Sequence, residues 1–468
     1  MSKNVKMKLA TLALAGLSAV ASSSVLAGKM TVDTNGGLEV FRSDNSDYWF
    51  KIGGRLHLDQ AFIEGGETDR SAYPSGSQIR RARITFKGGV GNKWVYKLDV
   101  DHFDRASRFA GSPYPIGNPG FAEFGEAFIA YTGCPNVWAA LGQISVPYSL
   151  EGWQSANDTA FMEVALPVEA FSRDTTGLGV YAEWHGDMFT LAGAVYQPKA
   201  GTPQIGDFYI PGVAGVGDAS IGPNGSDPGS DPLGVGARLT FSPVHTDQNT
   251  YHLGLHGRYQ QLHDHANFLQ FYTPTEIRSR QSAWLTTNIP LRSVKNYQIV
   301  GFELAGQWDS VILSGEYIHA KAEREGNFTL VSDGAAGLMT DPRSPGGDQK
   351  FYGYYVAASW VLTGEKKDYD FATGTFGRVR PKSSKGAWEL GARHSYVKLV
   401  DDQQMASMPF SSENPQNPNN PIGAENSTTV GLTWWVNNNV RFLLNYAHAN
   451  LPNTTDLNLL GFRGQVNW

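Results

Sequence analysis

The sequence has 468 residues, a formal net charge of −6 and a mean hydropathy of −0.31, with 41% hydrophobic residues, 12% aromatic residues and 53 glycines. This composition is unlike that of a helical membrane protein and suits β-strands with one apolar and one polar face. The single cysteine, Cys134, excludes an internal disulfide framework. Because no Pro/Ser-rich linker divides the chain, we expect one large unit.

The N-terminus has the pattern of a cleaved export signal. Three lysines precede an apolar run from Leu9 to Val20, and the small-residue pattern of a cleavage site ends at Ala27. The run is too short for a transmembrane helix and no later segment is long enough, so strands must make any membrane crossing. We predict a signal peptide at 1–27, a periplasmic N-terminal segment at 28–49 and a transmembrane barrel at 50–468.

From residue 50 onward, runs of about ten alternating residues are separated by turn residues, which is typical of transmembrane barrel strands. In the run from 50 to 62, apolar side chains share one face while polar ones such as Arg55 and Asp59 share the other. Residues 81–87 and 94–101 alternate in the same way. These runs are longer than the five or six residues usual in soluble sandwiches.

Sixteen strands are counted, starting near residues 50, 77, 93, 123, 136, 175, 187, 233, 249, 296, 309, 350, 386, 426, 438 and 458. Tight turns are expected at 89–92, 133–136, 185–187, 308–310 and 437–439, and long connections at 64–76, 104–122, 145–174, 199–232, 263–295, 324–349 and 400–425. Short periplasmic turns and long outer loops predict an all-β fold, a transmembrane antiparallel β-barrel of about 16 strands. The connection 363–386 should be short and is not, so strand boundaries there stay open.

The third long connection, 145–174, is too apolar for an ordinary connector. Phe161, Val164 and Ala165 have helix-like spacing within 159–166, a stretch that ends before a proline. A loop with an apolar face needs a surface to pack against, which in a barrel is the lumen. We predict that this loop folds inward and narrows the channel. Its candidate site residues are Glu151, Asp158, Phe161, Glu163 and Arg173.

Basic residues recur on the predicted lumen face: Arg55, Arg81, Arg83, Lys97, Arg238, Arg258, Arg393, Arg441 and Arg463. Carboxylates accompany them, and a wet barrel interior is polar in any case, so these charges could simply pair across strands. An arginine, however, offers a planar fork of donors that holds an oxyanion, and rings of such charges favour anions in pores. We predict that Arg55, Arg81 and Arg83 form an anion-guiding strip.

The last run alternates to the final residue. Phe462 and Trp468 share its apolar face. Charged side chains are costly on the lipid face of a barrel and apolar ones suit it, so we expect these two aromatics to face lipid. A terminal aromatic on a closing strand resembles the signal by which outer-membrane barrels are recognised for assembly. We therefore predict that Phe462 and Trp468 form an assembly signal.

These segments resemble the phosphate-selective porins of the O and P type. The matching segments follow in order over nearly the whole chain beyond residue 50, and include KIGGRLHLD (51–59), RRARITFKG (80–88), LGQISVPYSLE (141–151), SWVLTGEKKDYD (359–370) and GLTWWVNNNVRFLLNYAHA (431–449). The resemblance implies a sixteen-stranded barrel in the bacterial outer membrane, usually a homotrimer, with basic residues lining an anion channel narrowed by the third outer loop. The family often has a basic residue entering that loop, where Ser145 and Val146 stand here, which leaves phosphate specificity open.

The predicted function is a passive porin for small hydrophilic solutes, anions such as phosphate, with no cofactor and no nucleic-acid partner. Expected partners are outer-membrane lipid, the solutes, two further copies in a homotrimer and the barrel-assembly machinery. A barrel-embedded hydrolase and a non-conducting structural or adhesive barrel stay open as alternatives, although no GxSxG, HExxH or nucleotide-binding loop is present. His252, His256, His263 and His265 could share a metal but have no defined ligand motif.

Overall fold

The computed structural model describes residues 31–32, 38–42, 47–65, 73–102, 122–172, 175–198, 232–262, 269, 271–279, 284–286, 294–324, 331–332, 338–339, 348–401, 423–451 and 456–468. The predicted signal peptide and the side chains of Arg173, His263 and His265 lie outside these ranges. None of the helices described is both long enough and apolar enough to cross a membrane.

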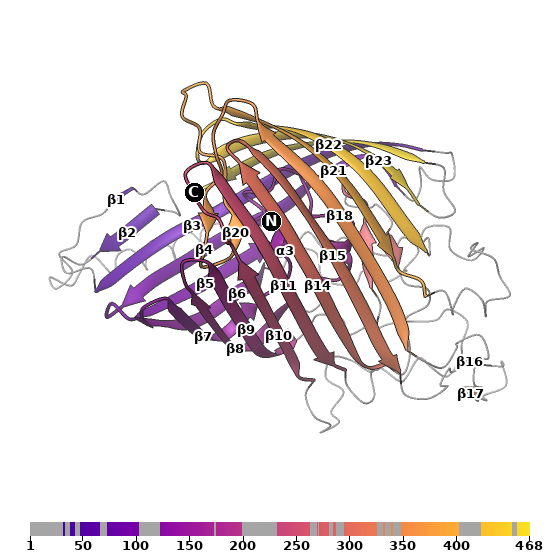
Figure 1. Ribbon diagram of the computed structural model, residues 1–468, viewed down its shortest axis with the longest axis horizontal. Helices are drawn as coiled ribbons and strands as arrows, with labels where there is room; N and C mark the ends of the chain where they lie inside the picture. Colours follow the sequence, from indigo (N-terminus) through magenta and orange to yellow (C-terminus); the bar gives the residue numbers. More distant parts are fainter. Residues whose placement is uncertain are drawn as a thin grey trace, which may run out of the picture.

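Sixteen antiparallel strands close into a barrel (Figure 1). The strands of the ring are β3 (Tyr48–Glu64), β4 (Gly76–Val90), β5 (Trp94–His102), β6 (Ala122–Cys134), β7 (Val137–Ser145), β8 (Thr176–His185), β9 (Phe189–Pro198), β10 (Gly234–Phe241), β11 (Asn249–Gln261), β14 (Val294–Trp308), β15 (Val311–Arg324), β18 (Gln349–Val361), β21 (Ala387–Lys398), β22 (Ala424–Trp435), β23 (Val440–Asn450) and β24 (Leu457–Asn467). Each begins within two residues of its predicted start. The predicted strand count is confirmed.

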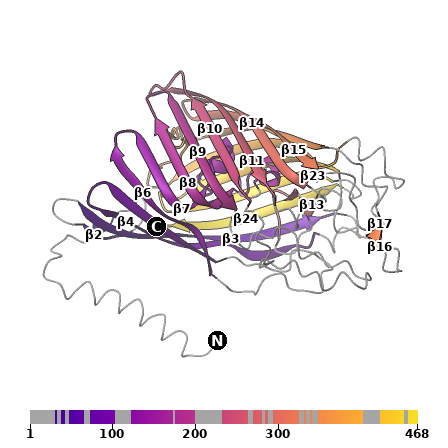
Figure 2. The ribbon, with the colours of Figure 1, turned by 90° about the horizontal axis from the view of Figure 1, so that it is seen from below.

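The ring closes where β24 pairs with β3, from Asn458↔Glu64 to Asn467↔Arg55 (Figure 2). Two further strands, β1 (Thr31–Val32) and β2 (Leu38–Arg42), extend the sheet: β1 pairs with β2, and β2 pairs with the start of β3. Within the described residues the main sheet thus has 18 strands, and 18 − 2 = 16 of them form the ring.

The two faces of each strand meet different surroundings. In β23, Phe442, Leu444 and Tyr446 point outward and are 36–45% exposed, while Arg441 and Leu443 point inward and are buried. An apolar band around a closed barrel is the surface that contacts lipid. The alternation read from the sequence therefore corresponds to an outer apolar face and an inner face covered by other parts of the chain.

The remaining elements belong to connections: β12 (Tyr272–Pro274), β13 (Trp284–Thr286), β16 (Val331–Ser332), β17 (Leu338–Met339), β19 (Tyr369–Asp370), β20 (Thr375–Phe376), α3 (Leu150–Trp153) and α4 (Leu166–Ala170). The helical stretch predicted at 159–166 is wrong, since α4 begins where that stretch should end. A proline is tolerated in the first helical turn, where its missing N–H would have no partner anyway. Pro167 therefore starts a helix instead of ending one.

The long connection between β18 and β21, residues 362–386, contacts inward-facing side chains of the barrel. Its hairpin of β19 and β20 packs Tyr369 and Phe376 against Ile312. Arg238 Nη1 donates to the Thr373 carbonyl at 2.6 Å. We call residues 362–386 the inner turn. Its length, which did not fit the alternation of tight turns and long loops, reflects this inward course.

Candidate functional site

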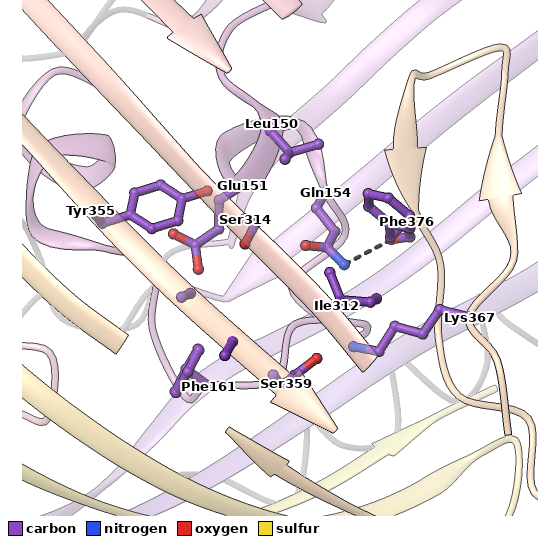
Figure 3. A pocket seen from close by; sticks show the side chains of 13 residues that line it. Leu150, Glu151, Gln154, Phe161, Ile312, Ser314, Tyr355, Ser359, Lys367 and Phe376 are labelled. Carbon is purple, nitrogen blue, oxygen red and sulfur yellow. Dashed lines mark hydrogen bonds between the residues drawn. The ribbon is translucent and has the colours of Figure 1, made fainter. Parts of the chain in front are cut away.

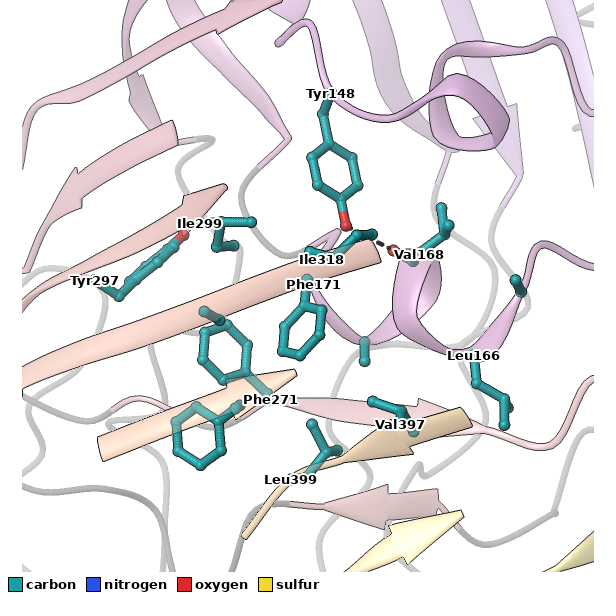
Figure 4. Close-up of a cluster of buried hydrophobic side chains, with 14 of the residues drawn as sticks. Tyr148, Leu166, Val168, Phe171, Phe271, Tyr297, Ile299, Ile318, Val397 and Leu399 are labelled. Carbon is teal, nitrogen blue, oxygen red and sulfur yellow. Dashed lines mark hydrogen bonds between the residues drawn. The ribbon is translucent and has the colours of Figure 1, made fainter. Parts of the chain in front are cut away.

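Residues 146–172, called here the inner loop, pack against inward-facing side chains of the barrel. Phe171 and Val168 lie in one hydrophobic cluster with Phe271 and Val397 (Figure 4). Close approach requires a glycine on the wall, because a Cβ added at Gly353 would lie 2.6 Å from the Pro167 Cβ. The apolar face of this loop is therefore covered by the barrel interior.

Two arginines from the wall hold the backbone of the inner loop. Arg393 on β21 donates from Nη2 to the Glu163 carbonyl at 3.0 Å. Arg441 on β23 donates to the carbonyls of Thr159 and Ala156 at 2.6 and 2.9 Å. Backbone carbonyls of a loop inside a barrel need such donors, since a buried unpaired carbonyl is costly.

Five of the basic residues predicted on the lumen face are almost fully buried, with 0–3% of their surface exposed: Arg238, Arg258, Arg393, Arg441 and Arg463. They point into the barrel, but the inner loop and inner turn cover them. Arg258, for example, donates to the Phe171 carbonyl at 2.8 Å. Solvent does not reach these five side chains, so their contacts are with the protein itself.

Glu151 connects two parts of the inner loop with the barrel wall. Its carboxylate accepts from Arg393 Nη1 and from the Ala165 N–H, each at 2.7 Å. Burial raises the pKa of the Glu151 carboxyl although Arg393 opposes the shift. Nearby, Glu316 on β15 accepts from the Glu151 N–H at 2.9 Å and from Ser149 Oγ at 3.0 Å. These contacts fix the start of the loop.

The inner loop and the inner turn contact each other. Gln154 Nε2 donates to the Phe376 carbonyl at 2.7 Å (Figure 3). Asp158 pairs with Arg378 at 3.1 Å. The cavity between the two segments, which Lys367 also lines, has a volume of about 50 Å³.

The wall formed by β3, β4 and β5 differs, because its basic side chains stay partly exposed. The exposed fractions are 20% for Arg80, 21% for Arg81, 23% for Arg83 and 27% for Lys97. Their carboxylate partners are less exposed, with 6% for Glu163, 0% for Asp99 and 8% for Asp101, although Glu126 keeps 21%. The surface that this wall presents to water is therefore predominantly basic. We call Arg55, Arg80, Arg81, Arg83 and Lys97 the basic wall.

The predicted strip of Arg55, Arg81 and Arg83 is divided between two sets of partners. Arg55 lies opposite Arg83 in the register of β3 and β4. Arg83 donates to Asp101 and Asp99, whereas Arg81 turns toward Glu163 on the inner loop. Among the described residues, the buried Nε of Arg55 has no hydrogen-bond partner.

Arg80 belongs to this wall although strict alternation assigns it to the outer face. A β-bulge is responsible: His57 pairs with Arg81 but the next residue, Leu58, pairs with Ile79, so Arg80 is the extra residue. Both arginines consequently reach Glu163. The adjacent Arg80 and Arg81 could have indicated that Arg80 also faces inward, because an arginine facing lipid costs about 2–4 kcal/mol at the bilayer midplane.

Glu163 is the meeting point of four arginines. Arg80 donates to its carboxylate from Nε and from Nη2, each at 2.8 Å, and Arg463 Nη2 donates at 2.6 Å. Arg278 Nη2 donates at 3.3 Å, and Arg81 makes two contacts at 3.4 Å. Burial alone would raise the pKa of the Glu163 carboxyl, but these guanidiniums hold it well below its usual range. Arg278 was missed because a loop without periodicity gives no indication that it enters the barrel.

A second acidic group lies near the histidines of β11. His256, Glu303 and Glu316 each place one possible ligand atom within 4.8 Å of the others. Arg238 and His252 donate to Glu303, with contacts of 2.7–3.0 Å. Because the protein's own donors already hold these carboxylates, we assign no metal to them.

At the C-terminus, Phe462 and Trp468 are each 44% exposed on the outer face. Phe462 stacks on Phe442 with ring centroids 6.0 Å apart. Trp468 exchanges two backbone hydrogen bonds with Gly54, at 2.9 and 3.0 Å. The last residue thus joins the seam of the barrel, and its role in assembly stays a prediction.

Known proteins resemble this chain in sequence and in fold. The family model of phosphate-selective porin O and P matches residues 50–468. Porin O of Pseudomonas aeruginosa is 25% identical over 470 residues, 94% of this chain and 93% of that relative. Among solved structures, an anion-selective porin from Comamonas acidovorans gives a TM-score of 0.49 at 10% identity, covering 90% and 100% of the two chains. OmpT of Vibrio cholerae gives 0.49 at 10% identity over 92% and 99%. With a family model matching from the first barrel strand to the last residue, the chain belongs to the phosphate-selective porin O and P family.

Proposed function

We propose that this outer-membrane porin passes small anions along the basic wall, between β3–β5 and the inner loop. The observation that carries the proposal is a difference in exposure: Arg80, Arg81, Arg83 and Lys97 keep 20–27% of their side chains open, whereas three of their four carboxylate partners, Asp99, Asp101 and Glu163, keep 0–8%. The fourth partner, Glu126, keeps 21%. A charge at a narrow, poorly screened part of a pore acts strongly on a passing ion. Anions therefore meet attraction here, and cations repulsion.

Phosphate is a suitable solute for this route. Its oxygens accept several hydrogen bonds at once, and the planar fork of arginine matches them in pairs. The name of the family and the similarity to Porin O support the same choice. The acidic groups of the inner loop, Glu151 and Asp158, are bonded to Arg393 and Arg378 and so add little charge to the route.

We also propose where the segments of the chain lie and how the channel assembles. Residues 1–27 are a removed signal peptide, residues 28–49 lie in the periplasm, and three copies assemble in the membrane with the help of the barrel-assembly machinery. The pairing of β2 with the start of β3, beyond the last residue of β24, is consistent with a segment that extends past the rim of the barrel. Membership of a porin family favours a channel over an enzyme.

Charge reversal on the wall tests this function. Arg81→Glu combined with Arg83→Glu should lower the anion-to-cation permeability ratio of channels in planar bilayers, because two exposed positive charges become negative. The matched control is Arg380→Glu with Lys382→Glu, the same change of charge at exposed residues of the inner turn. An equal shift in both double variants, or none in either, would show that the basic wall does not set selectivity.

A further inference from the structure

We infer that Glu163 is a tethered anion: in the resting channel its carboxylate occupies an oxyanion site made by Arg80, Arg81, Arg278 and Arg463, and a permeating oxyanion must displace it. The inference rests on the proposed function, since it concerns the same wall. It assigns Glu163 as the residue that sets how tightly the channel holds phosphate or another small oxyanion.

The site is built from three separate parts of the chain. Arg80 and Arg81 come from β4, Arg463 from β24 and Arg278 from the segment after β12. Six nitrogen–oxygen contacts of 2.6–3.4 Å converge on the two carboxylate oxygens. Arg463 also pairs with Asp59, and Arg278 also pairs with Glu169. Four guanidiniums nevertheless converge on the single carboxylate of Glu163, which indicates a site suited to an anion of higher charge.

The donors also exceed what a carboxylate can accept. A carboxylate offers about four lone-pair positions, whereas each guanidinium carries about five N–H groups. Arg81 accordingly makes only long contacts, both 3.4 Å, with Glu163. Across the strand pair, the buried Nε of Arg55 is unpartnered among the described residues. A tetrahedral oxyanion, with twice as many oxygens, would use this spare capacity better than Glu163 does.

The backbone next to Glu163 is fixed, which makes the side chain alone the moving part. Arg463 donates to the Met162 carbonyl, Arg393 donates to the Glu163 carbonyl at 3.0 Å, and the Ala165 N–H donates to Glu151 at 2.7 Å. The carboxylate can therefore leave the arginines and return without unfolding the loop.

A tethered competitor weakens binding of a free ligand. A group attached near its own site acts at an effective concentration on the order of millimolar or more. Phosphate must compete with that concentration, so it binds loosely and leaves quickly. Conduction requires such weak binding, because an ion held too tightly blocks the pore. Glu163 would thus convert a tight oxyanion site into a transit point.

The test is inhibition of chloride current by inorganic phosphate, measured on the full channel in planar bilayers. Glu163→Gln removes the competing charge and should lower the phosphate concentration that halves the current by about tenfold or more. Asp158→Asn is the matched control, since it removes one carboxylate from the same loop but pairs with Arg378, outside the four-arginine site. The control should change the phosphate concentration less than about threefold.

Equal phosphate sensitivity of wild type, Glu163→Gln and Asp158→Asn would overturn the inference. If Glu163→Gln gives no folded barrel, Glu163→Asp decides, because it keeps the charge but shortens the tether: stronger phosphate inhibition supports the inference and unchanged inhibition overturns it. A separate result decides the proposed function: a wild-type channel that prefers cations would contradict it, whatever the two Glu163 variants show.

Discussion

Arg463 on β24 has no exposed surface, and its guanidinium holds Asp59 through two contacts of 2.7 Å and Glu163 through one of 2.6 Å. Buried ion pairs of this kind are costly to break, because removing one partner leaves the other as an uncompensated charge. While Glu163 occupies the four-arginine site, Arg463 therefore stabilises the barrel and its inner loop. Three arginines of the basic wall differ because 20–23% of each side chain stays exposed.

We predict that Arg463→Ala lowers the stability of the folded barrel by about 3–5 kcal/mol, since Asp59 loses its buried partner. The measurement is the denaturant midpoint of the heat-modifiable barrel in detergent. Arg380→Ala is the control, because the Arg380 pair with Asp368 is more than half exposed and such pairs contribute about 0–1 kcal/mol. A loss no larger for Arg463→Ala than for Arg380→Ala would contradict the assignment.

The depressed pKa of Glu163 gives a pH dependence with a definite sign. A carboxyl whose pKa is lower in the folded state than its ordinary 4.5 contributes stability above that value and loses the contribution as pH falls toward the folded pKa. The melting temperature of the wild type should therefore fall more steeply below about pH 4.5 than that of Glu163→Gln. Parallel melting curves for the two proteins over this range would contradict the four-arginine environment.

Among the elements, the strands and the inward packing of the inner loop were predictable, whereas the helix within that loop and the course of the inner turn were not. Strand starts follow from a two-residue alternation that is local in sequence, so all sixteen could be located within two residues. Arg80 was missed because a β-bulge interrupts that alternation. Arg278 and the inner turn were missed because their inward course depends on contacts with distant strands, such as Arg238 to Thr373. Pro167 was misjudged because a proline can begin a helix as well as end one.

The inner loop is not needed for pairing between strands, since the ring of strand pairs is complete without it. Deletion of Ser155–Glu163 should therefore raise single-channel conductance and the size of polymer that enters the pore. It should also lower the melting temperature, because Arg441 and Arg463 lose their bonds to this segment. Unchanged conductance with an unchanged polymer-exclusion limit would mean that another segment forms the narrowest part.

At the scale of the whole molecule, closure depends on the last strand. Phe462 and Trp468 lie on the outer face, and Trp468 bonds to Gly54 at the seam. Replacing both aromatics with Asp should prevent insertion, because charge on the lipid face of a barrel is costly, most of all near the midplane. The readout is the amount of heat-modifiable barrel in outer-membrane fractions. Normal amounts from the double variant would show that these residues do not direct assembly.

We propose above all that the open route through this porin is lined by basic side chains and favours anions. The most direct test is the reversal potential of the wild-type channel in a planar bilayer between two concentrations of potassium chloride. We predict that the reversal potential has the sign that chloride permeation produces. In the Arg81→Glu, Arg83→Glu double variant the reversal potential should shift toward zero. A wild-type reversal potential of zero, or of the sign that potassium permeation produces, would contradict the claim.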